Sequence, residues 1–165
     1  ITTWWQLSKE HTYWQKQQII IKEEKIAEKK FDLFARSCFL FANIKHIKNQ
    51  MYLSDSAVDI NPYLNLGGFN ENIASITTRN YFELESKLVE SYVQLEATLD
   101  VIEEIYDNNE VKNISLKILN FIIDFRLFTT KRADKTTYSN EEVENGIEEQ
   151  SKLLISEMAR ELKGK

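Results

Sequence analysis

A run of carboxylates on one helical face is the first group of residues with the chemistry of a metal site. Glu96, Asp100, Glu103 and Asp107 recur at intervals of three and four residues, which brings them together along a helix. Carboxylate oxygens are the ligands that hard divalent cations prefer. Residues 81–110 contain nine acids and one lysine. We therefore favour a solvated acidic face over a cation site.

Histidine spacing gives no support for a second kind of metal site. Four-helix bundles that hold paired metal ions use a Glu-x-x-His motif, which places both ligands on one face. The chain has two histidines, and the residues three positions before His11 and His46 are Ser8 and Asn43. We predict that the protein binds no metal and no other cofactor.

Residues that could act as nucleophiles are also few. Cys38 is the one cysteine, so no disulfide can form within the chain. It lies in an apolar stretch, and we interpret it as a buried structural thiol. The sequence has no glycine-rich phosphate loop, zinc spacing or serine-nucleophile elbow. We expect the protein not to be an enzyme.

Four charged residues interrupt strongly apolar stretches of the sequence: Asp32, Arg36, Asp124 and Arg126. They could form a polar pocket between two helices. Ordinary ion pairs at the rim of a core explain the same residues more simply.

Aromatic residues with a preference for interfaces gather at the start of the chain. All three tryptophans, Trp4, Trp5 and Trp14, lie there, together with Tyr13. Trp and Tyr are enriched at the boundary between membrane and water, and lysine-rich flanks favour its cytoplasmic side. Five lysines follow the last tryptophan within sixteen residues. We interpret residues 1–25 as a membrane-proximal or self-associating helical stalk, with packing against another helix or a second copy as the alternative.

The charge distribution agrees with this division of the chain. Residues 1–50 carry nine Lys and Arg against five acids, whereas the net charge of the whole chain is −5. An acidic remainder disfavours non-specific binding of nucleic acid, and we predict none.

The chain lacks an initiating methionine, so we expect a transmembrane anchor to precede Ile1, with the remaining chain on the cytoplasmic side of a membrane. A soluble cytoplasmic protein is the alternative. In its organisation, though not in any diagnostic motif, the chain resembles small bacterial proteins with an N-terminal membrane anchor, a Lys/Glu-rich helix and a helical cytosolic domain.

The elements that position these residues are predicted to be helices. One proline and four glycines in 165 residues leave few chain breakers. Apolar residues recur at helical spacing through most of the chain. We predict an all-α bundle, with residues 26–165 as a single domain and with helices at 3–49, 73–107, 110–129 and 140–163. The last helix has a capping-box sequence, Ser139 followed three residues later by Glu142.

The predicted core follows the most apolar rows of these helices. In the first helix the row with steps of three and four residues is predicted to face the core, and a second row, Ile26, Leu33, Leu40 and Ile47, repeats every seven. The predicted core residues are Phe31, Phe34, Cys38, Phe41, Leu88, Leu95, Leu99, Ile118, Ile122 and Phe125.

Residues 51–72 are predicted to be a long apolar connection. They contain the one proline, Pro62, and the pair Gly67-Gly68. Connections of this length often carry function. Four of its residues are predicted to form a surface for a binding partner: Tyr52, Tyr63, Leu66 and Phe69.

These features favour a non-catalytic interaction or scaffold domain that forms a homo-oligomer, as a coiled coil through its N-terminal helix. The alternative is a ligand-sensing four-helix domain of a membrane receptor. A sensor of that kind would bind its ligand between helices, with polar groups that converge on one site.

Overall fold

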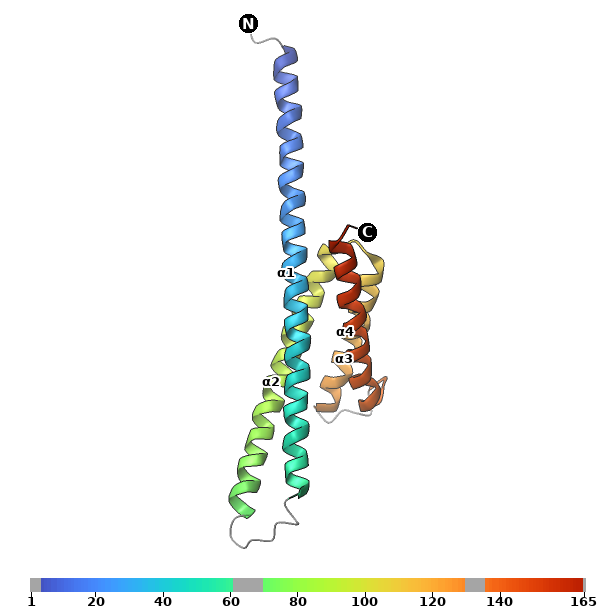
Figure 1. Cartoon of the computed structure of the whole chain (residues 1–165). Helices are drawn as coiled ribbons and strands as arrows, with labels where there is room; N and C mark the ends of the chain where they lie inside the picture. The colour runs from blue at the N-terminus through green and yellow to red at the C-terminus, as the bar shows by residue number, and fades with distance from the viewer. Residues whose placement is uncertain (1–3, 61–69, 130–135, 165) are drawn as a thin grey trace.

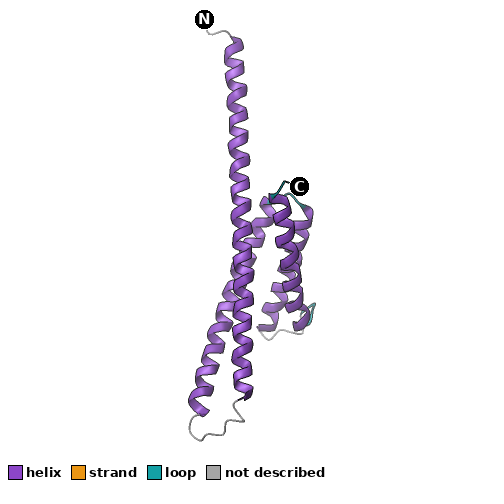
Figure 2. Ribbon diagram, in the orientation of Figure 1, coloured by secondary structure: helices purple, strands orange, loops and turns teal. Residues whose placement is uncertain are grey.

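The computed structural model describes residues 4–60, 70–129 and 136–164 and confirms the all-α class (Figure 2). Side chains are described for residues 11–53, 79–128, 136–139 and 141–164. Over these ranges the chain forms helices and no strands. The helices are α1 (Trp4–Ile60), α2 (Asn70–Ile105), α3 (Asn109–Thr129) and α4 (Asn140–Leu162).

The helices form two hairpins of unequal length. α1 and α2 pack against each other as one long antiparallel pair, and α3 and α4 form a shorter pair beside the middle of α1 (Figure 1). The N-terminal half of α1 extends well beyond the other three helices. The molecule is therefore a bundle with one helix projecting from it.

The first helix is longer than predicted. It continues to Ile60, whereas the sequence was interpreted as a connection from residue 51. That interpretation was wrong because residues 51–60 contain no glycine or proline, and their Asp and Ser residues do not by themselves end a helix. The first chain breaker is Pro62, and helices usually end at or before the residue preceding a proline.

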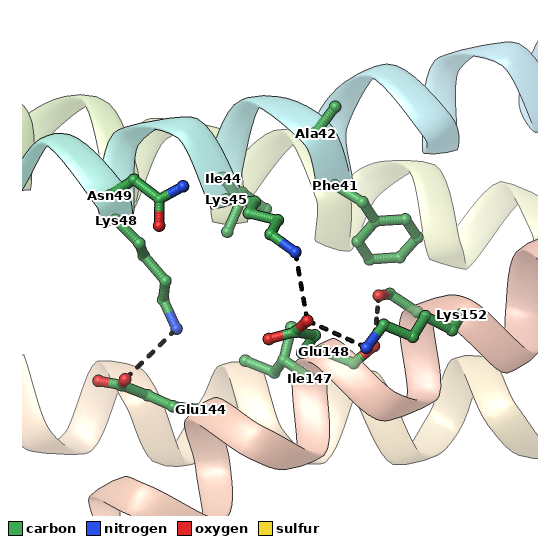
Figure 3. Close-up of a pocket in the computed structure, with 11 residues that line it drawn as sticks. Phe41, Ala42, Ile44, Lys45, Lys48, Asn49, Glu144, Ile147, Glu148 and Lys152 are labelled. Atoms are coloured by element: carbon green, nitrogen blue, oxygen red, sulfur yellow. Dashed lines mark hydrogen bonds and ion pairs between the residues drawn. The ribbon is translucent and has the colours of Figure 1, made fainter.

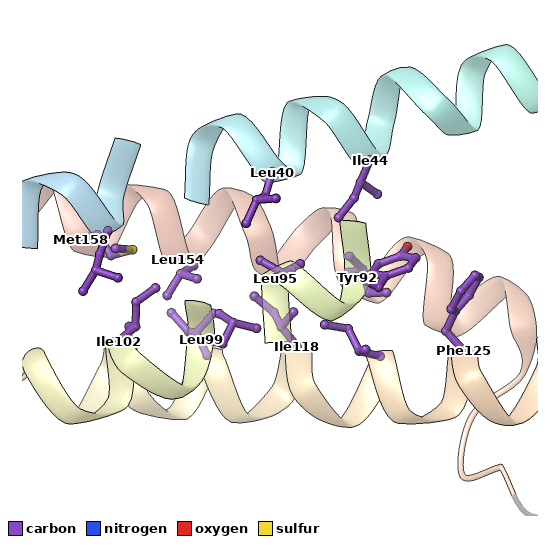
Figure 4. Packing of buried hydrophobic residues seen from close by; sticks show 14 of the residues in the cluster. Leu40, Ile44, Tyr92, Leu95, Leu99, Ile102, Ile118, Phe125, Leu154 and Met158 are labelled. Atoms are coloured by element: carbon purple, nitrogen blue, oxygen red, sulfur yellow. The ribbon is translucent and has the colours of Figure 1, made fainter. Parts of the chain in front are cut away.

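One face of α1 supplies its share of the core. Leu33, Leu40, Ile44 and Ile47 are buried, and the hydroxyl of Ser37 between them donates a 2.8 Å hydrogen bond to the carbonyl of Leu33. Figure 4 shows how this face meets the other three helices. Their buried residues are Leu88, Tyr92, Leu95, Leu99, Ile102, Tyr106, Val111, Ile114, Ile118, Ile122, Phe125, Val143, Ile147, Leu154 and Met158.

The predicted core is correct for α2 and α3 and wrong for α1. All six predicted residues from Leu88 to Phe125 are buried. In α1, however, Phe31 is 60% exposed, and Phe34, Cys38 and Phe41 are only half-buried. At 100° per residue, Phe31 lies about 160° around the helix from Leu33. Leu33, Leu40 and Ile47 belong to the row that repeats every seven residues, the spacing that keeps facing a neighbouring helix, and are buried, whereas Ile26 of the same row is exposed.

Local contacts explain where α3 and α4 begin. The side chain of Asn108 accepts a 2.8 Å hydrogen bond from the backbone N–H of Glu110 at the start of α3. At α4 the predicted capping box is confirmed: Ser139 and Glu142 each accept a hydrogen bond from the other's backbone N–H. These bonds satisfy donors that a helix N-terminus leaves without intrahelical partners.

Candidate functional site

The most unusual surface is the projecting part of α1. Every residue from 11 to 29 is exposed, and the helix here extends past the ends of α2, α3 and α4 (Figure 1). We call residues 11–29 the projecting segment. The first residue below it, Lys30, is ion-paired to Glu161 of α4 at 2.5 Å and to Asp107 at 4.0 Å. These contacts mark the level at which α1 enters the bundle.

The projecting segment exposes large apolar side chains around much of its circumference. Tyr13 is 65% exposed and Trp14 is 58% exposed. Ile19, Ile20, Ile21 and Ile26 are also exposed. A helix with apolar groups on several sides is normally covered by other helices or by lipid. Among the described residues, no other helix covers this segment.

The predicted N-terminal residues fall into two groups. Tyr13 and Trp14 lie on the projecting segment, and Gln17 donates a 3.1 Å hydrogen bond to the Tyr13 hydroxyl one turn away. Trp4 and Trp5 belong to the backbone of α1, but their side chains lie outside the described residues.

A groove between α1 and α4 is a second candidate site (Figure 3). It has a volume of about 280 Å³, just below the usual range for small-molecule sites. Its walls combine apolar and charged side chains: Phe41, Ile44, Lys45 and Lys48 from α1, and Glu144, Ile147, Glu148 and Lys152 from α4.

Ion pairs cross the groove between the two helices. The ammonium group of Lys45 lies 3.4 Å from the carboxylate of Glu148, and that of Lys48 lies 3.8 Å from Glu144. Lys152 also contacts Glu148, at 3.0 Å. Hydrogen bonds from Lys152 and Lys45 lower the pKa of Glu148. Burial lowers the pKa of Lys48, against the opposing effect of Glu144 and Glu148. The groove therefore holds a lysine whose charged form is disfavoured by its position.

The buried hydroxyl of Tyr92 lies close enough to Glu144 to be affected by its charge. Burial raises the pKa of Tyr92, and the charge of Glu144 adds to that effect. Its ring packs on Phe125 with 4.6 Å between centroids, and the hydroxyl has no hydrogen-bond partner among the described residues (Figure 4).

The groove residues were missed in the sequence. A signal was available: Lys45 and Lys48 are three residues apart and Glu144 and Glu148 are four apart, so each pair projects from one helical face. Complementary pairs of this kind on two helices indicate facing surfaces, but the sequence alone gives no pairing between α1 and α4.

The predicted partner surface does not form one described patch. Tyr52 is exposed and belongs to α1. Tyr63, Leu66 and Phe69 lie outside the described residues.

The four charged residues of the apolar stretches do not share one pocket. Asp32 and Arg36 are exposed. Asp124 is buried and accepts hydrogen bonds of 2.8 and 2.9 Å from the backbone N–H groups of Thr137 and Tyr138. Its role is to hold the chain that leads into α4.

The acidic row from Glu96 to Asp107 has structural partners at two positions, and the ion pair of Asp107 with Lys30 is described above. Glu96 forms an ion pair with Arg126 of α3. In the part of the chain whose side chains are described, no cluster of three or more His, Cys, Asp or Glu residues has the arrangement of a metal site.

None of the described helices has an apolar stretch long enough to cross a bilayer. Comparisons with protein-family models, with characterised proteins and with solved structures found no match to this chain.

Proposed function

We propose that the protein is a non-catalytic helical interaction domain that associates with a second copy through the projecting segment of α1. The observation that carries this proposal is the uninterrupted exposure of residues 11–29, which include six large apolar side chains. Burying them in an interface would remove them from water, at about 25 cal/mol for each Å² of apolar surface. In this function the bundle holds the interacting helix in place.

We further propose that this helix lies beside a membrane on its cytoplasmic side. Trp14 and Tyr13 at the outer end of the segment, followed by Lys16, Lys22 and Lys25, have the composition of an interfacial region. Flotation with vesicles that contain anionic lipid tests this part. We expect the protein to float with such vesicles, and Trp14→Ala to reduce the floating fraction. Equal flotation of Trp14→Ala would contradict a role for the ring in membrane contact.

Self-association is tested by sedimentation velocity over a range of protein concentrations. We expect the sedimentation coefficient to rise with concentration for the unchanged chain and to stay at the monomer value for Ile20→Glu. Phe39→Glu is the matched control, because Phe39 is a similarly exposed apolar residue of α1 that lies beside the bundle. Equal association of both variants, or a monomer at all concentrations, would contradict the proposal.

Ligand sensing is a second candidate function, and the groove between α1 and α4 is the observation that favours it. Its charged side chains comprise three lysines and two glutamates, set beside Phe41 and Ile147. This chemistry suits a small carboxylate with an apolar body, bound by Lys45 and Lys48. Calorimetric titration with short aliphatic and aromatic carboxylates tests it. Binding should be lost in Lys48→Met and kept in Lys163→Met, which changes a lysine outside the groove.

A further inference from the structure

We propose that the second copy docks antiparallel to the first, along the face of α1 that carries Tyr13, Ile20, Ala27 and Phe31. We call these four residues the docking face. The inference rests on the proposed self-association and adds its direction and register. Three features of the structure support it: the composition of the faces of α1, the position of α4, and the distribution of charge.

The docking face is the apolar row of α1 with the fewest charged residues at its seam, because only Gln17 and Glu24 lie between its members. Its members follow steps of seven and four residues, and Tyr13, Ile20 and Phe31 are each more than half exposed. The competing row contains Ile19 and Ile26, but it alternates with Lys16, Glu23 and Lys30, which are poor core residues for a helix pair. That row also leads directly into Leu33 and the core of the bundle.

The position of α4 excludes a partner that continues down this face. Beyond Phe31, steps of three and four residues along α1 lead through Cys38 to Ala42, Lys45 and Asn49. The last three residues line the groove against α4. A parallel partner would follow the face into α4. An antiparallel partner ends near Phe31, at the level where α1 enters the bundle, and the two bundles then lie at opposite ends of the pair.

Charge distinguishes the two directions independently of this steric argument. With the docking face as the seam, a parallel pair in register places Glu24 opposite Glu24 and Glu23 beside Glu28 of the other copy. Each of these contacts joins like charges, which destabilises the pair. A parallel arrangement therefore repeats the same carboxylate repulsion on both sides of the seam.

An antiparallel pair centred between Gln18 and Ile19 replaces these contacts with favourable ones. Lys16 of each copy then meets Glu23 of the other, and Trp14 meets Ile21. Each contact occurs twice because the pair has twofold symmetry. This antiparallel register therefore joins opposite charges and also covers exposed apolar side chains.

Cys38 is the one cysteine, so a label attached to it reports the direction of pairing. A spin label on each Cys38 should report a distance of about 60 Å in the antiparallel dimer, since the two sites are about 39 residues apart along the pair at 1.5 Å per residue. A parallel dimer would give about 10 Å, the usual spacing of helix axes. Burial raises the pKa of the Cys38 thiol, so labelling is done at mildly alkaline pH.

Charge reversal tests the register without any label. Glu23→Lys should weaken the antiparallel dimer roughly ten-fold, because it turns two attractions into repulsions, and the added change Lys16→Glu should restore the affinity. In a parallel dimer Glu23→Lys would instead strengthen association, because it removes the repulsion from Glu28. Sedimentation equilibrium gives the dissociation constants.

The possible outcomes separate the two proposals. A dimer with the long distance and charge-swap rescue supports the antiparallel register. A dimer with the short distance, or one strengthened by Glu23→Lys, overturns the direction and leaves self-association in place. A monomer overturns both proposals.

Discussion

The hydroxyl of Tyr106 at the end of α2 donates a 2.8 Å hydrogen bond to the backbone carbonyl of Lys30 in α1. The ammonium group of Lys30 lies 5.3 Å from the centre of the same ring and also contacts Glu161 of α4. These contacts join three helices at the level where α1 leaves the bundle. They hold the base of the projecting segment.

Replacing Tyr106 with Phe should destabilise the protein by about 1 kcal/mol, the usual net value of one hydrogen bond. The effect stays small because the Lys30 carbonyl lies within α1, where it also serves as an acceptor for the helix itself. Urea denaturation measures the free energy of unfolding. A loss several times larger would mean that the ring position, and not the hydroxyl, was disturbed.

Tyr92→Phe, unlike Tyr106→Phe, should not destabilise the protein. Its hydroxyl is buried and has no hydrogen-bond partner among the described residues. Removing a buried donor that makes no bond relieves a desolvation cost, so we expect unchanged or increased stability. The comparison with Tyr106→Phe is matched, because each variant removes one buried tyrosine hydroxyl. A clear loss of stability in Tyr92→Phe would show that the hydroxyl is bonded in solution.

Alkaline pH should destabilise the protein through the same two residues. Burial raises the pKa of both phenols, and the charges of Glu144 and Glu161 raise those of Tyr92 and Tyr106 further. A raised pKa gives stability that is fully present below the unfolded value of about 10 and is lost as the pH rises above it. Denaturation between pH 8 and 11.5 measures this slope. It should be shallower in the Tyr92→Phe/Tyr106→Phe variant, and an equal slope would contradict the assignment.

Ser139→Ala should destabilise α4 by about 1 kcal/mol, since the side chain caps the helix. The companion residue Glu142 has a pKa lowered by hydrogen bonds from Ser139. Its contribution is present above the unfolded pKa and is lost as the pH falls through the lowered value. The Glu142→Gln variant should therefore lose less stability than the unchanged protein between neutral and acid pH. Thermal denaturation followed by circular dichroism checks both variants.

Gly146→Ala should destabilise the protein, although alanine is the better helix former by about 1 kcal/mol. A Cβ at residue 146 would lie 2.6 Å from Cε2 and 2.7 Å from Cε1 of Phe121 in α3. Overpacking of this kind costs about 1–3 kcal/mol. The second change Phe121→Leu should remove the clash, so that part of the stability expected from alanine as the better helix former is recovered. Higher stability in Gly146→Ala alone would show that the ring moves aside easily.

The sequence predicted the number of helices because glycine, proline and cap residues are few and well placed. The capping box at Ser139 gave the correct start of α4, and the helix predicted from residue 110 begins one residue after the observed start of α3 at Asn109. The same reasoning placed the end of α1 too early. It assigned Met51 to the connection that contains Pro62 and Gly67-Gly68, although Met51 packs on the core.

The choice of core face in α1 could not be made from periodicity. The rows through Phe31 and through Leu33 both have helical spacing, and they face different sides of one helix. Which row is buried depends on where α2 and α4 lie, and that is a property of the tertiary structure. The groove was missed for the same reason, since Lys45 and Glu148 are 103 residues apart in sequence.

The unbroken course of α1 also fixes a rotational relationship between its two ends. No glycine or proline occurs between Trp4 and Ile60, so a turn of the outer end is transmitted to the groove residues. Adding one residue to the projecting segment would rotate Trp14 by about 100° relative to Lys48, whereas adding seven would rotate it by about 20° and lengthen the helix by about 10 Å. The helix thus sets both the distance and the angle at which the bundle is presented to whatever its outer end contacts.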